Sequence, residues 1–178
     1  MKVTLMDSQI EECMEHGFTR AMRYMDQFME RYERQPDNPG DWKKLNGNFF
    51  QFVALQAEAV ASEMIVGLAL GLDFGDLGDK RNKTKADVGH NFEVKWTRWA
   101  DGHLIIAPQD RDSDIAILVT GSCPTYEIKG WMPVKMAKQA KFKASHDTSY
   151  WVSQINLRPF ETLRRSTYGE DLASMPKV

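Results

Sequence analysis

Cysteine is scarce in this sequence, and the two residues present, Cys13 and Cys123, form no CxxC pair. The sequence therefore predicts neither a disulfide framework nor a zinc knuckle. A chain of 178 residues is long enough to bury a substantial core without such cross-links. We expect one compact domain, or one domain with an appendage, in a cytoplasmic environment.

Long apolar runs are also missing. The most apolar stretch, residues 54–72, contains Glu58, Glu63 and other polar residues, and it falls short of the ~20 apolar residues that a membrane span needs. The first 13 residues lack an apolar core followed by small residues, so no signal peptide is predicted. The sequence thus indicates a soluble, unexported protein with no membrane partner.

Several common catalytic motifs do not occur. There is no GxxxxGK[ST], no GxGxxG after a strand, no GxSxG and no HExxH. These absences exclude the usual nucleotide-driven motors and zinc proteases.

Charge is unevenly distributed along the chain, although the net charge is only -2. Residues 1–79 contain seven Lys and Arg against fourteen Asp and Glu, whereas residues 80–178 contain sixteen against eleven. The second part is therefore the one suited to a polyanion.

Two helices are predicted before any strand. Residues 7–34 place apolar side chains at three- and four-residue spacing, which is typical of a helix with one apolar face for core or dimer packing. Two prolines and a glycine within residues 35–40 end it. Residues 48–70 contain few polar positions and predict a second helix that is central and largely buried. Residues 72–87 have no helical period and predict a long loop.

The rest of the chain is predicted to be mainly extended. An Asp-Gly turn between residues 91–99 and 103–107 predicts a hairpin. Residues 115–120 are apolar on both faces and predict a central strand, which residues 126–131 follow. A short helix is expected over residues 132–143.

This order of elements predicts an α+β fold, an α/β sandwich in which helices flank a central mixed sheet of four to five strands. We expect residues 1–40 to form an additional N-terminal amphipathic helix and linker. Residues 41–178 are expected to form the main domain.

The string DVGHNFEVK contains the residues most suggestive of chemistry. In a strand, residues i and i+2 share a face, so Glu93 and Lys95 are expected side by side while Phe92 and Val94 face the core. A turn beginning at Asp87 would return its carboxylate to Glu93. Two adjacent carboxylates repel unless a divalent cation lies between them, and oxygen ligands suit Mg²⁺ or Mn²⁺.

The context of this string resembles the PD-(D/E)xK nuclease superfamily, in particular its small phage and bacterial members. A helix with Glu63 in EMIVGLALGL precedes Asp87, the string EVK follows, and the later strands end in a Gly-Trp pair. The resemblance covers roughly residues 46–163. Ala86 stands where the family name would put proline, and no sequence-specific DNA-reading insert is evident.

The resemblance implies a restriction-endonuclease-like core and a role for each matching residue. Asp87 and Glu93 would be the metal-binding carboxylates, and the carbonyl of Val94 would be a further ligand. Lys95 would position or activate the attacking water. Glu63 would complete the metal shell from the helix, and Glu58 is the second candidate for that place.

Basic residues near this string are candidates for contact with the phosphate backbone, and two histidines are accessory candidates. Trp96 and Trp99 lie among them and could stack on bases, although packing within the fold is the alternative for both. The basic candidates are Lys80, Arg81, Lys83, Lys85, Arg98, Lys135 and Lys138, and the accessory candidates are His90 and His103.

The sequence therefore predicts a Mg²⁺- or Mn²⁺-dependent nuclease that hydrolyses DNA, with RNA also open as substrate and endo or exo cleavage undecided. A phage or mobile-element origin is implied, and hence the host cytoplasm as location. A homodimer through the N-terminal helix is the candidate assembly. The alternatives are a catalytically inactive relative that binds nucleic acid or protein, and a purely structural α+β protein.

Overall fold

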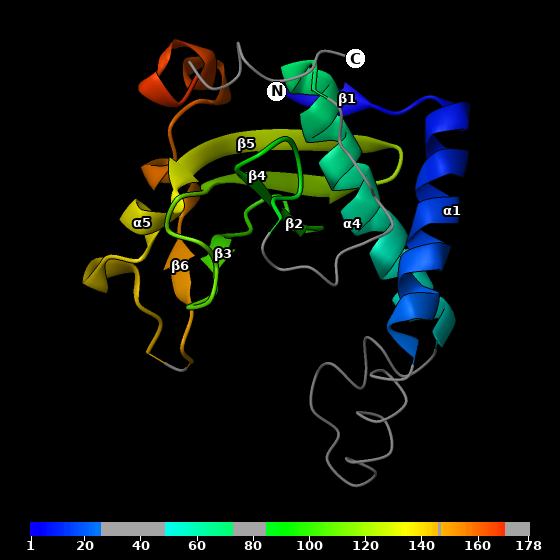
Figure 1. Ribbon diagram of the computed structural model, residues 1–178, viewed down its shortest axis with the longest axis horizontal. Coiled ribbons are helices and arrows are strands. Elements are labelled where there is room, and N and C mark those ends of the chain that lie inside the picture. Colours follow the sequence, from blue (N-terminus) through cyan, green and yellow to red (C-terminus); the bar gives the residue numbers. More distant parts are fainter. Residues whose placement is uncertain (26–48, 73–84, 146, 170–178) are drawn as a thin grey trace, which may run out of the picture.

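The computed structural model describes residues 1–25, 49–72, 85–145 and 147–169. Within these ranges the chain is a mixed α+β fold in which helices and a small second sheet cover a four-stranded sheet (Figure 1). Short 3₁₀ turns lie between and after the last elements. The helices and strands are β1 (Lys2–Thr4), α1 (Asp7–Arg23), α4 (Phe49–Leu70), β2 (Phe92–Thr97), β3 (Leu104–Ile106), β4 (Ile115–Ser122), β5 (Thr125–Pro133), α5 (Val134–Ala137) and β6 (Tyr150–Val152).

The main sheet has the strand order β1-β5-β4-β2. Strands β2 and β4 are parallel, whereas β5 is antiparallel to both β4 and β1. The residues of β4 from Ile115 to Thr120 are all buried, because strands lie on both sides of β4 and both faces of the sheet are covered. The predictions of a mixed four-stranded sheet and of a central strand at residues 115–120 are confirmed.

The predicted hairpin between residues 91–99 and 103–107 is wrong. β2 pairs with β4, and β3 pairs instead with β6 in a separate two-stranded sheet. Leu104 and Ile106 of β3 are fully buried in a cluster that includes Ala116 and Leu118 of β4. The apolar side of β3 therefore covers the main sheet, and this burial outweighs the local turn signal at residues 100–102.

Strand β1 was not predicted, because three residues are too short to show alternation. Its pairing with β5 places the first residues of the chain in the main sheet, and the N-terminal ammonium donates to the Ile128 carbonyl at 2.8 Å. Leu5 and Cys13 belong to the same core cluster as α4. The described part of the predicted N-terminal segment is thus packed into the main domain, while the proposed boundary at residue 40 lies outside the described residues.

Helix α4 covers one face of the main sheet, and β3, β6 and α5 cover the other (Figure 1). The predicted helix at residues 48–70 is confirmed as α4, which contributes Val60, Met64 and Ile65 to the core. By length and composition alone α4 would pass for a membrane span, although half of that segment is buried inside the fold. The helix predicted over residues 132–143 is shorter than expected, since α5 ends at Ala137 and a single 3₁₀ turn follows.

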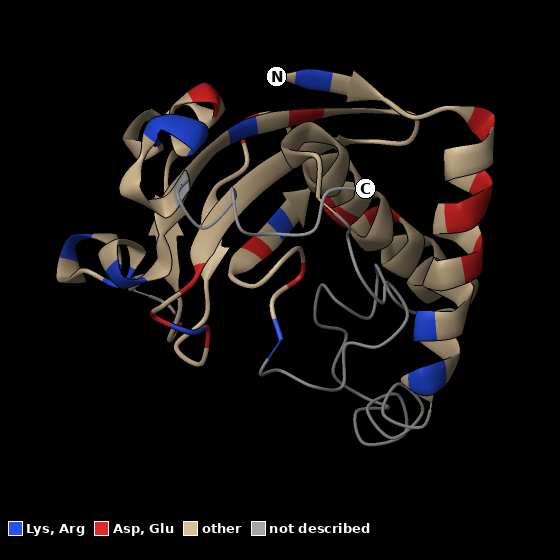
Figure 2. Cartoon of the chain, turned by 45° about the horizontal axis from the view of Figure 1, so that its top comes forward, with Lys and Arg blue, Asp and Glu red and all other residues tan. Residues whose placement is uncertain are grey.

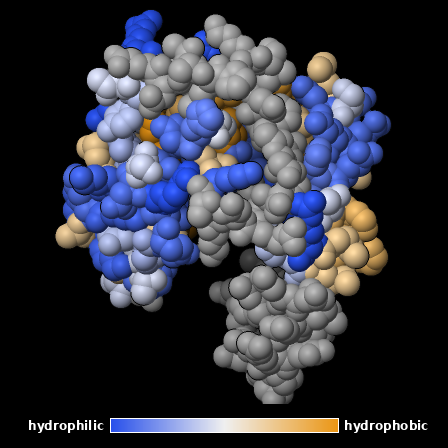
Figure 3. Space-filling view, viewed as in Figure 1, coloured by the Kyte–Doolittle hydropathy of each residue, from blue (hydrophilic) through white to orange (hydrophobic). Residues whose placement is uncertain are grey.

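Helix α1 packs on α4 with a face different from the predicted apolar stripe. A Cβ added at Gly17 would lie 2.5 Å from the Ala57 Cα atom of α4, so the missing side chain permits this close crossing. The stripe is consequently divided: Cys13 is buried, whereas Met14 and Phe18 are 60% and 53% exposed. Hydrophobic surface is visible where the lower ends of α1 and α4 lie (Figure 3). A homodimer through this helix stays a prediction.

Candidate functional site

The turn before β2 places Asp87 at one edge of the main sheet. The amide groups of Asp87 and Val88 both donate to the Phe92 carbonyl, and Gly89 supplies the positive φ of 57° that this turn requires. The Asp87 Oδ2 atom accepts a 2.7 Å hydrogen bond from the Val94 amide. In a parallel pair, the N–H and C=O of one residue point to the same side. The Val94 carbonyl therefore points to the same edge as Asp87, as a metal site formed by the two would require.

Glu93 and Lys95 lie on the face of β2 opposite α4, as the strand alternation predicted, while Phe92 and Val94 pack in the core. The Lys95 Nζ atom is 2.8 Å from Glu93 Oε1 and 2.9 Å from Asp110 Oδ2. Asp110 follows β3 and is fixed by a 2.9 Å hydrogen bond from the Ala107 amide. One ammonium thus joins two carboxylates in a partly buried cluster, and the adjacent acidic and basic positions of β2 are visible in Figure 2.

The surroundings of Glu93 disfavour its negative charge. Burial is the main cause of a raised pKa, and the charge of Asp87 raises the pKa further, although Lys95 opposes the shift. The pKa of Lys95 is also raised, because attraction to Glu93 and Asp110 exceeds the effect of its own burial. Asp87 and Asp110 therefore both act electrostatically on Glu93, with Lys95 as the compensating cation.

The described ion pair of Glu63 is with Arg20 of α1 and not with this cluster. Both of its carboxylate oxygens accept from the Arg20 guanidinium of α1, at 3.1 and 2.8 Å, and both side chains are buried. The described contacts give Glu63 a structural role in joining α1 to α4.

Glu58, the other helix candidate, is also directed elsewhere. Its Oε2 atom accepts a 2.6 Å hydrogen bond from the Tyr126 hydroxyl, and the Cys123 amide lies 3.3 Å away. Burial and the adjacent carboxylate raise the pKa of Tyr126, so its hydroxyl stays protonated. Glu58 thereby connects α4 to the turn between β4 and β5.

The predicted nucleic-acid contacts are distributed over several surfaces. Lys85, Arg98 and Lys135 are exposed. Lys138 instead donates to the Asp110 carbonyl and to Asp112 Oδ1, at 2.5 and 2.6 Å, and so holds the acidic loop after β3. It is therefore less available to a phosphate than the exposed basic residues. Lys80, Arg81 and Lys83 lie outside the described residues.

The two histidines and two tryptophans of this region have separate positions. His90 is exposed in the turn before β2, and His103 lies against the Trp151 ring with 5.9 Å between ring centroids. Trp96 is held by a 3.0 Å hydrogen bond to the Gly121 carbonyl, whereas Trp99 is 67% exposed. Trp96 is therefore fixed in place with part of its ring accessible, whereas most of Trp99 is exposed to solvent.

Comparison with known proteins does not assign this chain to a family. No family model, curated protein or solved structure matches it. The cluster on β2 must therefore be interpreted from its own geometry.

The donor set at this edge suits a hard cation that retains water. It offers the Asp87 and Glu93 carboxylates and the Val94 carbonyl, and Mg²⁺ is usually held by one or two carboxylates together with waters and substrate phosphates. Among the described residues, no three His, Cys, Asp or Glu side chains are grouped as a metal site. The residues therefore fit a cation completed by water and a phosphate rather than a cage made by protein alone.

Two residues of this region were not singled out from the sequence. Asp110 is not among the sequence candidates, because its proximity to Lys95 depends on how β3 folds over the sheet. Asn91 precedes β2, and its buried Oδ1 atom has no hydrogen-bond partner among the described residues. The backbone carbonyl of Asn91 accepts a hydrogen bond from the Ile115 amide, which extends the β2–β4 ladder by one residue. Strand alternation then places Asn91 on the same face as Glu93, where a donor or a cation would satisfy it.

Metal affinity at this cluster should depend on pH. Because the pKa of Glu93 is raised, a proton competes with the cation at a higher pH than it would at an ordinary glutamate. Mn²⁺ affinity should therefore increase with pH until Glu93 is fully ionised and then level off. Calorimetric titration of Mn²⁺ from pH 5 to 8 measures this, and a Glu93→Gln variant should lose most of the dependence. A flat profile in the unmodified protein would contradict the assignment.

Proposed function

We propose that this protein is a Mg²⁺-dependent phosphodiesterase that acts on DNA, with a site at the β2 edge of the main sheet. The observation that carries this proposal is the clustering of Asp87, Glu93 and Lys95, with two carboxylates held close enough for one to raise the pKa of the other. Repulsion of this kind between neighbouring carboxylates is typical of sites that bind a cation or transfer a proton. A restriction-endonuclease-like core is the finer fold assignment that goes with this proposal.

Each residue would have a defined task. Asp87 and Glu93, with the Val94 carbonyl, would hold one cation, which when bound lowers the pKa of a water and offsets charge on the scissile phosphate. Lys95 would leave its contacts with Glu93 and Asp110 to stabilise the negative charge that develops on the phosphate oxygens. Asp110 would keep the lysine oriented in the absence of substrate. Exposed Lys85 and Arg98 would contact flanking phosphates.

A cleavage panel tests this function directly. The full-length protein is incubated with labelled linear duplex, circular, branched and single-stranded DNA and with RNA, in Mg²⁺, in Mn²⁺ and in EDTA. We expect cleavage of at least one DNA substrate with either metal, and none in EDTA. Products from circular DNA would assign endonuclease activity. Absence of cleavage throughout the panel would contradict the proposal.

The alternative function is a nuclease-like protein that binds nucleic acid without cutting it. The observation that favours this alternative is the internal neutralisation of the cluster, in which Lys95 is shared by Glu93 and Asp110 while Glu63 is paired with Arg20. Metal titration separates the two functions, because a cation that binds only the folded protein raises its melting temperature. Salt-sensitive DNA binding with no such shift would support the binding protein.

A further inference from the structure

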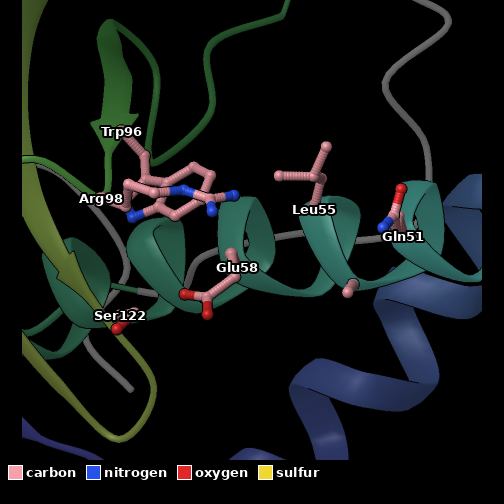
Figure 4. A pocket seen from close by; sticks show the side chains of 7 residues that line it. Gln51, Leu55, Glu58, Trp96, Arg98 and Ser122 are labelled. Carbon is pink, nitrogen blue, oxygen red and sulfur yellow. The ribbon is translucent and has the colours of Figure 1, made fainter. Parts of the chain in front are cut away.

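A cavity with mixed polar and apolar lining lies at the ends of β2 and β4, beyond Thr97 and next to Ser122 (Figure 4). Its volume is about 320 Å³, at the lower limit for small-molecule sites. Parallel strands direct their carboxyl ends to the same edge, where ligands of α/β sheets commonly bind. The cavity is lined by Gln51, Ala54, Leu55, Glu58, Trp96, Arg98 and Ser122.

One wall of this cavity is an immobilised aromatic ring. The Trp96 indole is half-buried, and its Nε1 atom donates to the Gly121 carbonyl at 3.0 Å. Its ring is therefore held in place before any ligand arrives. Aromatic side chains that line a pocket in this way stack on nucleobases.

A second wall offers a carboxylate that can only accept hydrogen bonds. Glu58 is half-buried, and its Oε2 atom is engaged by the Tyr126 hydroxyl, whereas among the described residues Oε1 has a single contact, 3.4 Å from the Cys123 amide. A carboxylate has about four acceptor positions, so Glu58 retains capacity for two further donors. The hydrogen bond from Tyr126 fixes the orientation of the Glu58 carboxylate and hence of its remaining acceptor positions.

The third wall supplies a positive charge. Arg98 is exposed and forms no ion pair with the residues that the structure describes. Figure 4 shows its side chain close to that of Trp96, beside α4. A guanidinium in such a position suits a phosphate group, to which it can donate two parallel hydrogen bonds.

We propose that this cavity binds an unpaired guanine nucleotide of the nucleic acid, an inference that rests on the proposed function. Guanine presents two adjacent donors, N1–H and N2–H, on its Watson–Crick edge, which match an acceptor-only carboxylate. Adenine, cytosine and uracil each present one donor there. Trp96 provides the stacking surface, and Arg98 binds the phosphate of the same nucleotide.

The position of the cavity relates it to the β2 cluster. Arg98 is three residues beyond Lys95, or roughly 10 Å along an extended strand, and the two side chains project to opposite faces. Because β2 lies at the end of the strand order, a nucleic-acid strand can pass around it. Guanine bound beside Trp96 would therefore lie close to the phosphate that is cut, and cleavage would favour sites beside an unpaired guanine.

Nucleotide binding by the full-length protein tests the inference without requiring cleavage. Affinities for GMP, AMP, CMP and UMP are measured by calorimetry for the unmodified protein and for Glu58→Gln, Arg98→Ala and Lys95→Met. We expect GMP to bind at least tenfold more tightly than the other three. Glu58→Gln should lose that preference, and Lys95→Met should retain it. Glu161→Gln, which replaces an exposed glutamate far along the chain, is the matched control and should leave GMP affinity unchanged.

The Arg98→Ala variant keeps the test decisive if Glu58→Gln fails to fold, because Arg98 is exposed. Arg98→Ala should lower the affinity for GMP about tenfold. The affinity for guanosine, which has no phosphate, should be unaltered. Equal affinities for the four nucleotides, or GMP binding that neither variant weakens, would overturn the inference while leaving Mg²⁺-dependent cleavage intact. Guanine-selective binding without cleavage of any substrate would instead overturn the proposed function and retain the nucleotide site.

Discussion

Replacing Glu93 with glutamine is expected to lower Mg²⁺-dependent DNA cleavage by on the order of 100-fold or more. The substitution preserves the size of a partly buried side chain but removes the charge that a cation requires. It also removes the attraction that holds Lys95, whose ammonium lies 2.8 Å from Glu93 Oε1. Lys95→Met should have an effect of similar size, because it removes the ammonium that would stabilise the charge developing on the phosphate oxygens.

A second Glu-x-Lys pair in the chain supplies the control for this experiment. Glu127 and Lys129 of β5 have the same spacing, and their charged atoms are 2.5 Å apart. Strand β5 is separated from β2 by β4, so Glu127→Gln should cleave like the unmodified protein. Initial rates on the preferred substrate, with melting temperatures as a check of folding, give the comparison. If Glu93→Gln and Glu127→Gln retain equal activity, the catalytic cluster has been misplaced.

Removal of Arg20 should produce the largest loss of stability among the single substitutions considered. Arg20→Met leaves the buried Glu63 carboxylate without its two hydrogen bonds. Removing one partner of a buried ion pair typically costs about 3–5 kcal/mol. Urea unfolding followed by circular dichroism should therefore show a much lower midpoint, and the exposed Arg165→Met should show almost no change.

The paired variant separates loss of the charge from loss of packing. In Arg20→Met combined with Glu63→Leu, apolar side chains of comparable size occupy both positions, and most of the lost stability should return. Full Mg²⁺-dependent activity in a folded double variant would show that Glu63 is dispensable for the metal. A double variant that is folded but unable to bind Mn²⁺ would instead restore Glu63 as a ligand.

The secondary structure of the described regions was predictable where periodicity was long. The apolar run of α4 and the fully apolar β4 both indicated buried elements, and the alternation in β2 correctly placed Glu93 and Lys95 together. The Asp-Gly turn was misleading, because a turn signal does not specify the strand with which the following residues pair. That choice was made by burial of Leu104 and Ile106 against the main sheet.

The candidate site was predictable only in its local part. Asp87, Glu93, Val94 and Lys95 lie within nine consecutive residues, so their proximity follows from one turn and one strand. The contacts of Lys95 with Asp110, Glu63 with Arg20, and Glu58 with Tyr126 join residues distant in the chain. They depend on how whole elements pack, which no local pattern records. The orientation of α1 about its own axis is one example, since Gly17 and Arg20 face α4 while the Phe18 side chain is exposed to solvent.

The hydrogen bond from the Val94 amide to Asp87 has a consequence for self-association. A strand at the end of a sheet exposes amide groups that can pair with another chain, and native proteins block such edges with charges or tight turns. On β2 a single negatively charged residue occupies one of these donors. Substitution of Asp87 by alanine would therefore expose an unpaired amide at the sheet edge as well as remove a metal ligand. Aggregation through that edge would lower the measured activity even if the chemistry were intact. Asparagine, which can still accept from the amide, avoids that confusion.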